Sequence, residues 1–468
     1  MAGWGAACSY PSATNYAATG RTTASSLPQS IRPLPPVWVR GARMGQNVLG
    51  SVAGQQAPMR QGRDTLACYD LKTTAESLSG LRFWLVCGDD EARPIAPLDP
   101  AFEVRRDYGR PIAAPVAGNE RRTLNFIIPA DRTRTNGFTV QLWMDNTSLT
   151  GYRDTGRVQR LGESTHLGFD PPPSRPLVVG VIGTQVSVGG YKPAPDPGAS
   201  SKVATHLQEA IPALWPLTTN DFRIVRDLGD YLYEGENTVG WLFSRTASVG
   251  LQTYLAWGLS RFIEEYNASA PQKLDFLVAV VPAGSLSGAY GVTTARWHRI
   301  CLVDERHPWA ALHELGHCLG LYMDTEQYDL PDGPDGRGNL IDNVPGADMG
   351  ARLQDMTAFV PEAGARFTQL GGRRIGHFPF GVDPSMHDLM GNNAQHWIVP
   401  TTLADIRAAL RGVLGVQPGA ALAGAPPPTR GGRLLFSGLL EHGPIPQYKV
   451  SGYRLVPDYW EFWQGRTS

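Results

Sequence analysis

Two histidines and a glutamate within five residues form the motif best suited to chemistry in this sequence. Residues 313–317 read His-Glu-Leu-Gly-His, so His313 and His317 are four positions apart and Glu314 lies between them. On a helix, side chains at positions i and i+4 share one face, so both imidazoles can bind one zinc ion from successive turns. A carboxylate beside a metal-activated water can take its proton during attack on a peptide carbonyl. The spacing therefore predicts His313 and His317 as zinc ligands and Glu314 as a catalytic general base.

The residues around this motif fit a short helix. Pro308 is placed to begin the helix, and Gly320 is placed to end it just after the second histidine. The alternative is that both histidines are ordinary surface or core residues. The chain has only 10 His, and chance would produce this five-residue pattern on the order of once in a hundred such sequences. The pattern therefore favours a metal site.

The run His313 to Gly320, His-Glu-Leu-Gly-His-Cys-Leu-Gly, resembles the zinc helix of the metzincin metalloproteases. A second run, 387–399, reads His-Asp-Leu-Met-Gly-Asn-Asn-Ala-Gln-His-Trp-Ile-Val and is similar to the Asp-Leu-Met turn of bacterial metzincins that follow an N-terminal β-sandwich. The resemblance implies a zinc endopeptidase in which Gly320 turns the chain towards a third ligand. It also implies that Met390 lies beneath the metal without binding it.

The third metal ligand is where the chain departs from the family. Metzincins have His or Asp three residues after the glycine, whereas this chain has Met323 there and Asp324 one place later. A thioether is a poor zinc ligand beside two imidazoles, so Asp324 is the predicted third ligand. His387, just before the Asp-Leu-Met turn, is the rival. Asn392 stands where the family commonly has a Tyr that supports the developing oxyanion, and an Asn amide can donate the same kind of hydrogen bond.

The resemblance also implies a substrate strand. In metzincins an edge strand above the cleft pairs with extended substrate, and Gly288, Ala289 and Tyr290 are in the right order to supply it. An ordinary Gly-rich hairpin is the alternative. Oxygen-bearing side chains at 332–342 have a spacing like that of a calcium loop, so Ca²⁺ is a second candidate ion, although a solvated loop is favoured.

The distribution of apolar runs predicts a multidomain fold. A chain of 468 residues exceeds what one core usually supports. Short alternating runs separated by turn residues predict strands at 65–71, 81–87, 123–128 and 138–144. The proline-rich stretch 170–176 cannot form helix or central strand, so it is interpreted as an interdomain linker.

Strands and helices alternate beyond this linker. The predicted strands are 177–182, 274–281 and an extended segment at 291–303, and the predicted helices are 201–214 and 251–266. The predicted fold class is thus an N-terminal all-β sandwich followed by an α/β metzincin-like catalytic domain and a short C-terminal β segment. The predicted units are an N-terminal extension at 1–35, an Ig-like β-sandwich at 36–170, the catalytic domain at 175–418 and the β segment at 430–468.

Charge and composition restrict the partners. Lys plus Arg is 42 and Asp plus Glu is 43, a balance that gives no electrostatic basis for binding nucleic acid. No run approaches the roughly 20 apolar residues of a membrane-spanning helix. Residues 1–30 have neither a basic start nor a continuous apolar run, so no signal peptide is expected there, although the resemblance favours a secreted or surface-acting protein. The resemblance implies a protein or peptide substrate.

The cysteines are too few for a disulfide framework. Of the five, Cys68 and Cys87 lie in neighbouring predicted strands and could form one bridge, or could be two buried thiols. Cys318, beside a motif histidine, is expected to be buried and structural. Two other functional classes stay open: a metzincin-fold binding or structural module without turnover, and a zinc hydrolase of another class with a Glu from a later helix as third ligand.

Overall fold

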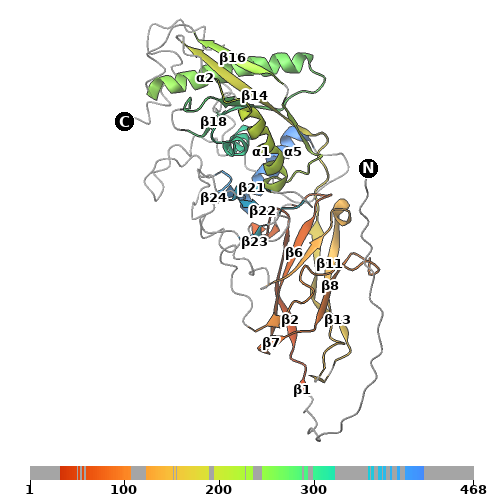
Figure 1. Cartoon of the computed structure of the whole chain (residues 1–468). Helices are drawn as coiled ribbons and strands as arrows, with labels where there is room; N and C mark the ends of the chain where they lie inside the picture. Colours follow the sequence, from red (N-terminus) through yellow and green to blue (C-terminus); the bar gives the residue numbers. More distant parts are fainter. Residues whose placement is uncertain are drawn as a thin grey trace, which may run out of the picture.

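The structure is a computed structural model that describes residues 32–49, 51–52, 55–56, 59–106, 123–150, 152–153, 155–188, 194–226, 228–235, 245–286, 289–293, 299–321, 357–358, 360–362, 367–370, 373–375, 380–381, 387–390 and 396–415. Across these residues the protein is of mixed α/β class, with several sheets and four α-helices (Figure 1). We refer to residues 32–169 as the β region and to residues 177–415 as the α/β region.

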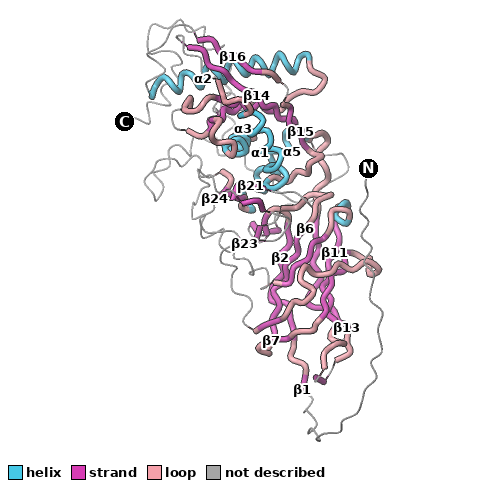
Figure 2. The backbone as a smooth tube through the Cα atoms, viewed as in Figure 1, coloured by secondary structure: helices cyan, strands magenta, loops and turns pink. Residues whose placement is uncertain are grey.

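Two antiparallel sheets build most of the β region (Figure 2). One has the strand order β10-β6-β2 and the other β13-β11-β8. The strands are β2 (Val37–Gly45), β6 (Thr65–Thr73), β8 (Arg82–Cys87), β10 (Leu124–Ile128), β11 (Gly137–Asp145) and β13 (Val158–Gly168). Four of these six correspond to the strands predicted from the sequence. Shorter elements complete the region: β1 (Arg32–Pro33), β3 (Val48–Leu49), β4 (Ser51–Val52), β5 (Gln55–Gln56), β7 (Ser77–Leu78), β9 (Val104–Arg105), β12 (Tyr152–Arg153) and a 3-10 helix (Arg132–Arg134).

The two sheets share one core. Alternate residues of a strand point to the same face, and on β10 the residues Leu124, Phe126 and Ile128 pack into the cluster that also holds Val140 and Leu142 of β11. The alternation of apolar residues in the sequence therefore determines which side of each sheet is buried.

The disulfide considered between Cys68 and Cys87 is not formed. Both thiols are free and buried. Burial raises the pKa of the Cys68 thiol to about 12 and that of Cys87 to about 11, so both behave as apolar core residues.

A mostly parallel sheet forms the centre of the α/β region. Its order is β15-β14-β17-β19-β18, and β16 pairs with β14 beyond the end of β15. All pairings are parallel except that of β18 with β19. The bounds are β14 (Leu177–Val188), β15 (Phe222–Val225), β16 (Asp230–Gly235), β17 (Phe276–Val281), β18 (Gly291–Thr293) and β19 (Ile300–Asp304). The extended segment predicted at 291–303 is thus two strands, because the chain reverses between them.

Helices cover both faces of this sheet (Figure 1). On one face, Val179 and Val181 pack with α1 (Ala199–Leu214), α3 (Ala310–Cys318) and α5 (Pro400–Leu414). On the other, Val178 and Ile182 pack with α2 (Arg245–Ser269). A parallel sheet buried on both faces requires the near-continuous apolar strands that the sequence shows. Within the described part of the chain, no helix is long and apolar enough to cross a membrane.

Several short strands follow α3, and one of them pairs with the β region. They are β20 (Thr357–Ala358), β21 (Phe367–Leu370), β22 (Arg373–Ile375), β23 (Phe380–Gly381), β24 (His387–Asp388) and β25 (His396–Trp397). β20 pairs with β23 and also with β3 of the β region, so one small sheet contains strands from both regions.

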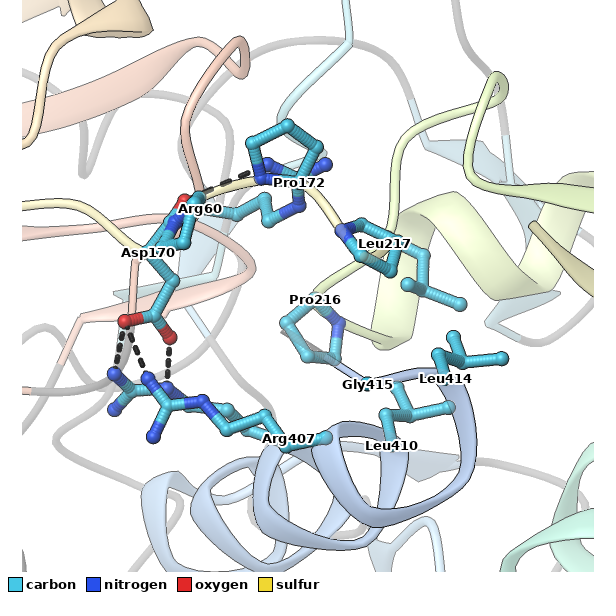
Figure 3. A pocket seen from close by; sticks show the side chains of 12 residues that line it. Arg60, Asp170, Pro172, Pro216, Leu217, Arg407, Leu410, Leu414 and Gly415 are labelled. Carbon is cyan, nitrogen blue, oxygen red and sulfur yellow. Dashed lines mark hydrogen bonds and ion pairs between the residues drawn. The ribbon is translucent and has the colours of Figure 1, made fainter. Parts of the chain in front are cut away.

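Ion pairs reinforce this connection at the proline-rich stretch. Arg60 of the β region donates two hydrogen bonds to the Asp221 carboxylate, at 2.8 and 2.9 Å. The Asp170 carboxylate pairs with Arg407 and Arg411 of α5 beside a small pocket of about 40 Å³ (Figure 3). The start of the predicted linker is therefore packed into a contact between the two regions.

Candidate metal centre

Helix α3 places the two motif histidines side by side in the interior. Every residue of α3 is buried, and the helix packs on β19 and β18. The imidazole rings of His313 and His317 have centroids 4.8 Å apart and are nearly perpendicular, at 82°. Their Nε2 atoms are 3.1 Å apart. The predicted i, i+4 arrangement on one helix face is confirmed for these two side chains.

Backbone carbonyls determine which nitrogen of each ring carries the proton. The Nδ1 of His313 lies 2.9 Å from the Leu389 carbonyl oxygen, and the Nδ1 of His317 lies 2.9 Å from that of Leu321. A carbonyl oxygen can only accept, so each Nδ1 is the protonated nitrogen and donates to it. Each Nε2 is then the basic nitrogen of its ring, and the two basic nitrogens face each other.

This pair fits two corners of a zinc site. Two nitrogens held about 2.0–2.1 Å from a tetrahedral zinc ion are roughly 3.3 Å apart, close to the separation seen here. Zinc-bound histidines commonly donate their other N–H to a carbonyl or carboxylate, as both rings do. Among the residues described, no group of three His, Cys, Asp or Glu side chains converges as a metal site. Both candidates for the third ligand, Asp324 and the side chain of His387, lie outside the described residues.

Glu314 is oriented by the edge strand of the sheet. The Thr293 hydroxyl donates a hydrogen bond of 2.8 Å to Oε2 of Glu314 and lies 3.1 Å from its backbone carbonyl. Gly291, on the same strand, leaves room for this carboxylate, because a Cβ there would lie 2.6 Å from Oε1 of Glu314. The structure thus holds the predicted general base, which follows His313 in α3, against β18.

Met390 lies directly against the helix that carries the histidines. Its side chain is fully buried, and a Cβ on Gly316 would overlap the Met390 sulfur. The glycine between the two histidines therefore permits the close approach of this methionine. Met390 therefore packs against Gly316, the residue between Leu315 and His317 in the motif.

Asp388 holds the turn that contains Met390. Its carboxylate accepts hydrogen bonds from the backbone N–H groups of Met390 and Val399 and from the Thr402 hydroxyl, each at 2.9 Å. Burial raises the pKa of Asp388 to about 6, although these three donors act in the opposite direction. The turn is therefore fixed on both sides of Leu389, whose carbonyl orients His313.

The residues predicted to pair with substrate stand directly before the edge strand. β18 begins at Gly291, so Ala289 and Tyr290 precede it, and Gly288 lies outside the described residues. The Tyr290 side chain is 41% exposed. Its ring centroid lies 4.3 Å from that of His307 and 5.1 Å from that of Trp309, which adjoins α3. These three rings form an aromatic cluster between the edge strand and the start of α3.

Of the other residues predicted near this site, the structure describes Cys318. Cys318 is buried, as expected, and it lies next to Cys301 of β19, whose thiol pKa is raised by burial. Asn392 and the candidate calcium loop at 332–342 lie outside the described residues.

Sequence reasoning missed two contributors to this site. Thr293 carries no signal of its own, because its role depends on the reversal that places β18 against β19 and α3. Asp388 stands in the run that resembles the metzincin turn, but no spacing rule distinguishes its side chain from a surface carboxylate.

No protein-family model matches this sequence, and no curated protein is similar enough to register as a match.

Proposed function

We propose that this chain is a zinc-dependent endopeptidase of the metzincin type. The observation that carries the proposal is the convergence of the Nε2 atoms of His313 and His317. Glu314, on the same helix, is held by the Thr293 hydroxyl. The resemblance of residues 313–320 and 387–399 supports the same activity. Asp324 is proposed as third ligand, with His387 as the rival, and Asn392 as a donor to the developing oxyanion.

The roles of the residues follow from their positions. When bound, zinc would polarise a peptide carbonyl and activate water for attack. Glu314 takes a proton during the attack and returns it to the leaving amine. Thr293 donates to one carboxylate oxygen of Glu314, which favours the ionised form and restricts its rotation. The Leu389 and Leu321 carbonyls hold the two imidazoles in the tautomer that a metal requires.

The sheet edge beside Glu314 is suited to an extended peptide. β18 pairs with β19 on one side, and among the described strands it is the last of its sheet. A peptide added as a further strand would bind through main-chain hydrogen bonds, with its carbonyl groups near Glu314. The aromatic cluster of Tyr290, His307 and Trp309 adjoins this edge and offers apolar contact to a substrate side chain. We therefore propose a protein or peptide substrate.

The domain organisation is part of the same proposal. Most of the β region packs into a core of its own, Val48 of β3 being part of an α/β cluster, and its two sheets suit an Ig-like sandwich. The α/β sheet, with its antiparallel edge strand beside the motif helix, suits a metzincin catalytic domain. A secreted or surface-acting location is proposed from the family resemblance.

The test is peptide hydrolysis by zinc-loaded and metal-depleted protein on casein or gelatin. We expect about one zinc per molecule by native mass spectrometry, loss of hydrolysis on chelation, and recovery when zinc is added back. A zinc-free preparation with full activity would contradict the proposal. One bound zinc without hydrolysis of any protein tested would indicate instead a binding or structural module with the metzincin fold.

A further inference from the structure

The β region is linked to the candidate metal centre through buried hydrogen bonds and the pairing of two short strands. We propose that Asn47 and Trp397 are positioning residues for the His313 ligand, so that the β region forms part of the metal centre. The proposal rests on the proposed function only in taking His313 as a zinc ligand.

The series begins at Asn47, directly before β3. This residue is fully buried and has φ of 60°, in the left-handed region where Asn and Gly are favoured. Its backbone carbonyl accepts a hydrogen bond of 3.0 Å from Nε1 of Trp397, a residue 350 positions later. The unusual backbone conformation directs that carbonyl towards the α/β region.

The series continues from Trp397 to the histidine. Trp397 of β25 pairs with Asp388 of β24. The Asp388 carboxylate holds the backbone N–H groups of Met390 and Val399. Between Asp388 and Met390, the Leu389 carbonyl accepts from Nδ1 of His313 at 2.9 Å. A displacement of Trp397 would therefore change the direction from which His313 presents Nε2.

Asn47 is itself held from both regions. Its amide donates to the Ala213 carbonyl of α1 at 2.7 Å, and its Oδ1 accepts from Arg63 Nη1 at 3.1 Å. Arg63 also donates to the Trp215 carbonyl at 3.0 Å and to the Pro212 carbonyl. The last carbonyls of a helix have no partner within it, so these β-region side chains satisfy the end of α1. Asn47 is thereby fixed against the α/β core.

Outer hydrogen-bond partners of a metal ligand affect the metal site measurably. They fix ring orientation, and their loss typically lowers metal affinity about 10- to 100-fold. The contact from Asn47 to Trp397 is more remote, so we expect an effect at the lower end of this range.

Trp397→Phe tests the proposal because it removes the Nε1 donor and keeps a ring in the core. Trp215→Phe is a matched control: Trp215 is equally buried in the same core, and its Nε1 has no hydrogen-bond partner among the described residues. We expect Trp397→Phe to weaken zinc binding about tenfold and Trp215→Phe to leave it unchanged, measured by competition with a chromogenic chelator. The visible spectrum of the cobalt-substituted protein should change only for Trp397→Phe.

Equal zinc affinity of the two variants would overturn the proposal. If both bind zinc as the wild type does, the Trp397 hydrogen bond has no effect on the metal, and if both are equally weakened, the loss comes from altered core packing. Failure of the wild-type protein to bind zinc would refute the proposed function instead, which is a distinguishable result. Asn47→Gly provides a second variant, since glycine accepts the left-handed φ and keeps the carbonyl but loses both side-chain anchors. Asn47→Gly should weaken zinc binding, as Trp397→Phe does. Wild-type zinc affinity in this variant would also reject the proposal.

Discussion

The β region and the α/β region both bury polar side chains, but they arrange them in opposite ways. In the β region the two terminal nitrogens of the fully buried Arg63 guanidinium donate to oxygens of Asn47, Pro212 and Trp215, while its Nε has no hydrogen-bond partner among the described residues. In the α/β region the buried imidazoles of His313 and His317 present their basic nitrogens to each other.

Arg63 therefore stabilises the fold, whereas His313 and His317 are arranged to bind a ligand. Most hydrogen bonds of such a buried cation are supplied by the fold itself. Two imidazole nitrogens that converge at 3.1 Å can be joined by a proton or by a metal ion, so their arrangement suits a cation bound between them. Substitutions at the motif residues of α3 should therefore reduce activity or metal binding, whereas substitution of Arg63 should reduce the stability of the fold.

The largest effect is expected for Glu314→Gln, which removes the proton acceptor and keeps the shape of the side chain. Peptide hydrolysis should fall by roughly 10²–10⁴-fold or more. The midpoint of thermal unfolding and the zinc content should stay close to those of the wild type, because the histidines and the Thr293 hydroxyl are retained. Initial rates on a protein substrate measure the loss, and wild-type rates in this variant would refute the assignment of Glu314.

A second large effect is expected for the third ligand. Asp324→Ala should weaken zinc binding severely, by about 100-fold or more, because a coordinating carboxylate is lost. His387→Ala should weaken it only mildly. Competition with a chromogenic chelator ranks the two variants. The reverse order would assign the ligand to the turn before Met390.

The elements that could be predicted from the sequence are those with a local pattern of residues. The i, i+4 histidines and the alternating strands are local patterns, so α3 and the strands around 124–128 and 137–145 could be predicted. The reversal between β18 and β19 could not, because residues 294–298, Thr-Ala-Arg-Trp-His, contain none of the Gly, Pro, Asn or Asp that usually indicate a turn.

The contact between the β region and the α/β region could not be predicted from the sequence for a different reason. Asn47 and Arg63 stand in irregular segments, and their partners lie about 150 or more positions away in the chain. No periodicity links such residues, so only the folded arrangement identifies them. The contacts of the proline-rich stretch are equally distant in sequence, because Asp170 at its start is held by two arginines of α5.

Arg63→Met tests the structural side of the comparison. The substitution leaves three buried acceptors without their donor, and we expect the free energy of unfolding to fall by about 3–5 kcal/mol. Burial lowers the pKa of Arg63 to about 9, although the charges of Glu362, Asp221 and Asp64 act in the opposite direction. Arg93→Met is the matched control, because the Arg93 side chain is 67% exposed in its pair with Asp90 and should cost at most about 1 kcal/mol. Chemical denaturation measures both, and equal stability of the two variants would contradict the assigned role of Arg63.

A smaller effect is expected for Thr293→Val, which removes one hydrogen bond to the Glu314 carboxylate. A hydrogen bond to a charged group contributes about 1.5–3 kcal/mol, so kcat should fall by about 10- to 150-fold if the whole contribution is lost in the transition state. Loss of a donor to the ionised form raises the pKa of the carboxyl, so the acidic limb of the kcat/KM profile should move to higher pH. Thr293→Ser should restore both. A lower kcat with an unmoved acidic limb would indicate a packing defect.

The smallest effect concerns a histidine of the α/β region outside the metal centre. His206 lies on α1, and burial lowers the pKa of its imidazole from 6.5 to about 4. Between these values the unfolded chain binds more protons than the folded one, so the free energy of unfolding should decrease as pH falls from about 6.5 towards 4. The slope from one such group is at most about 1.4 kcal/mol per pH unit.

His206→Gln should remove this contribution, while His166→Gln, on exposed β13 of the β region, should leave it in place. Both variants keep His313 and His317, so acid release of a metal affects them equally and cancels in the difference from wild type. Denaturant midpoints at several pH values between 4 and 7 provide the measurement. If His206→Gln keeps the wild-type pH dependence of the free energy of unfolding, groups other than His206 cause that dependence. The buried imidazoles that distinguish the α/β region are then, among the described residues, His313 and His317 alone.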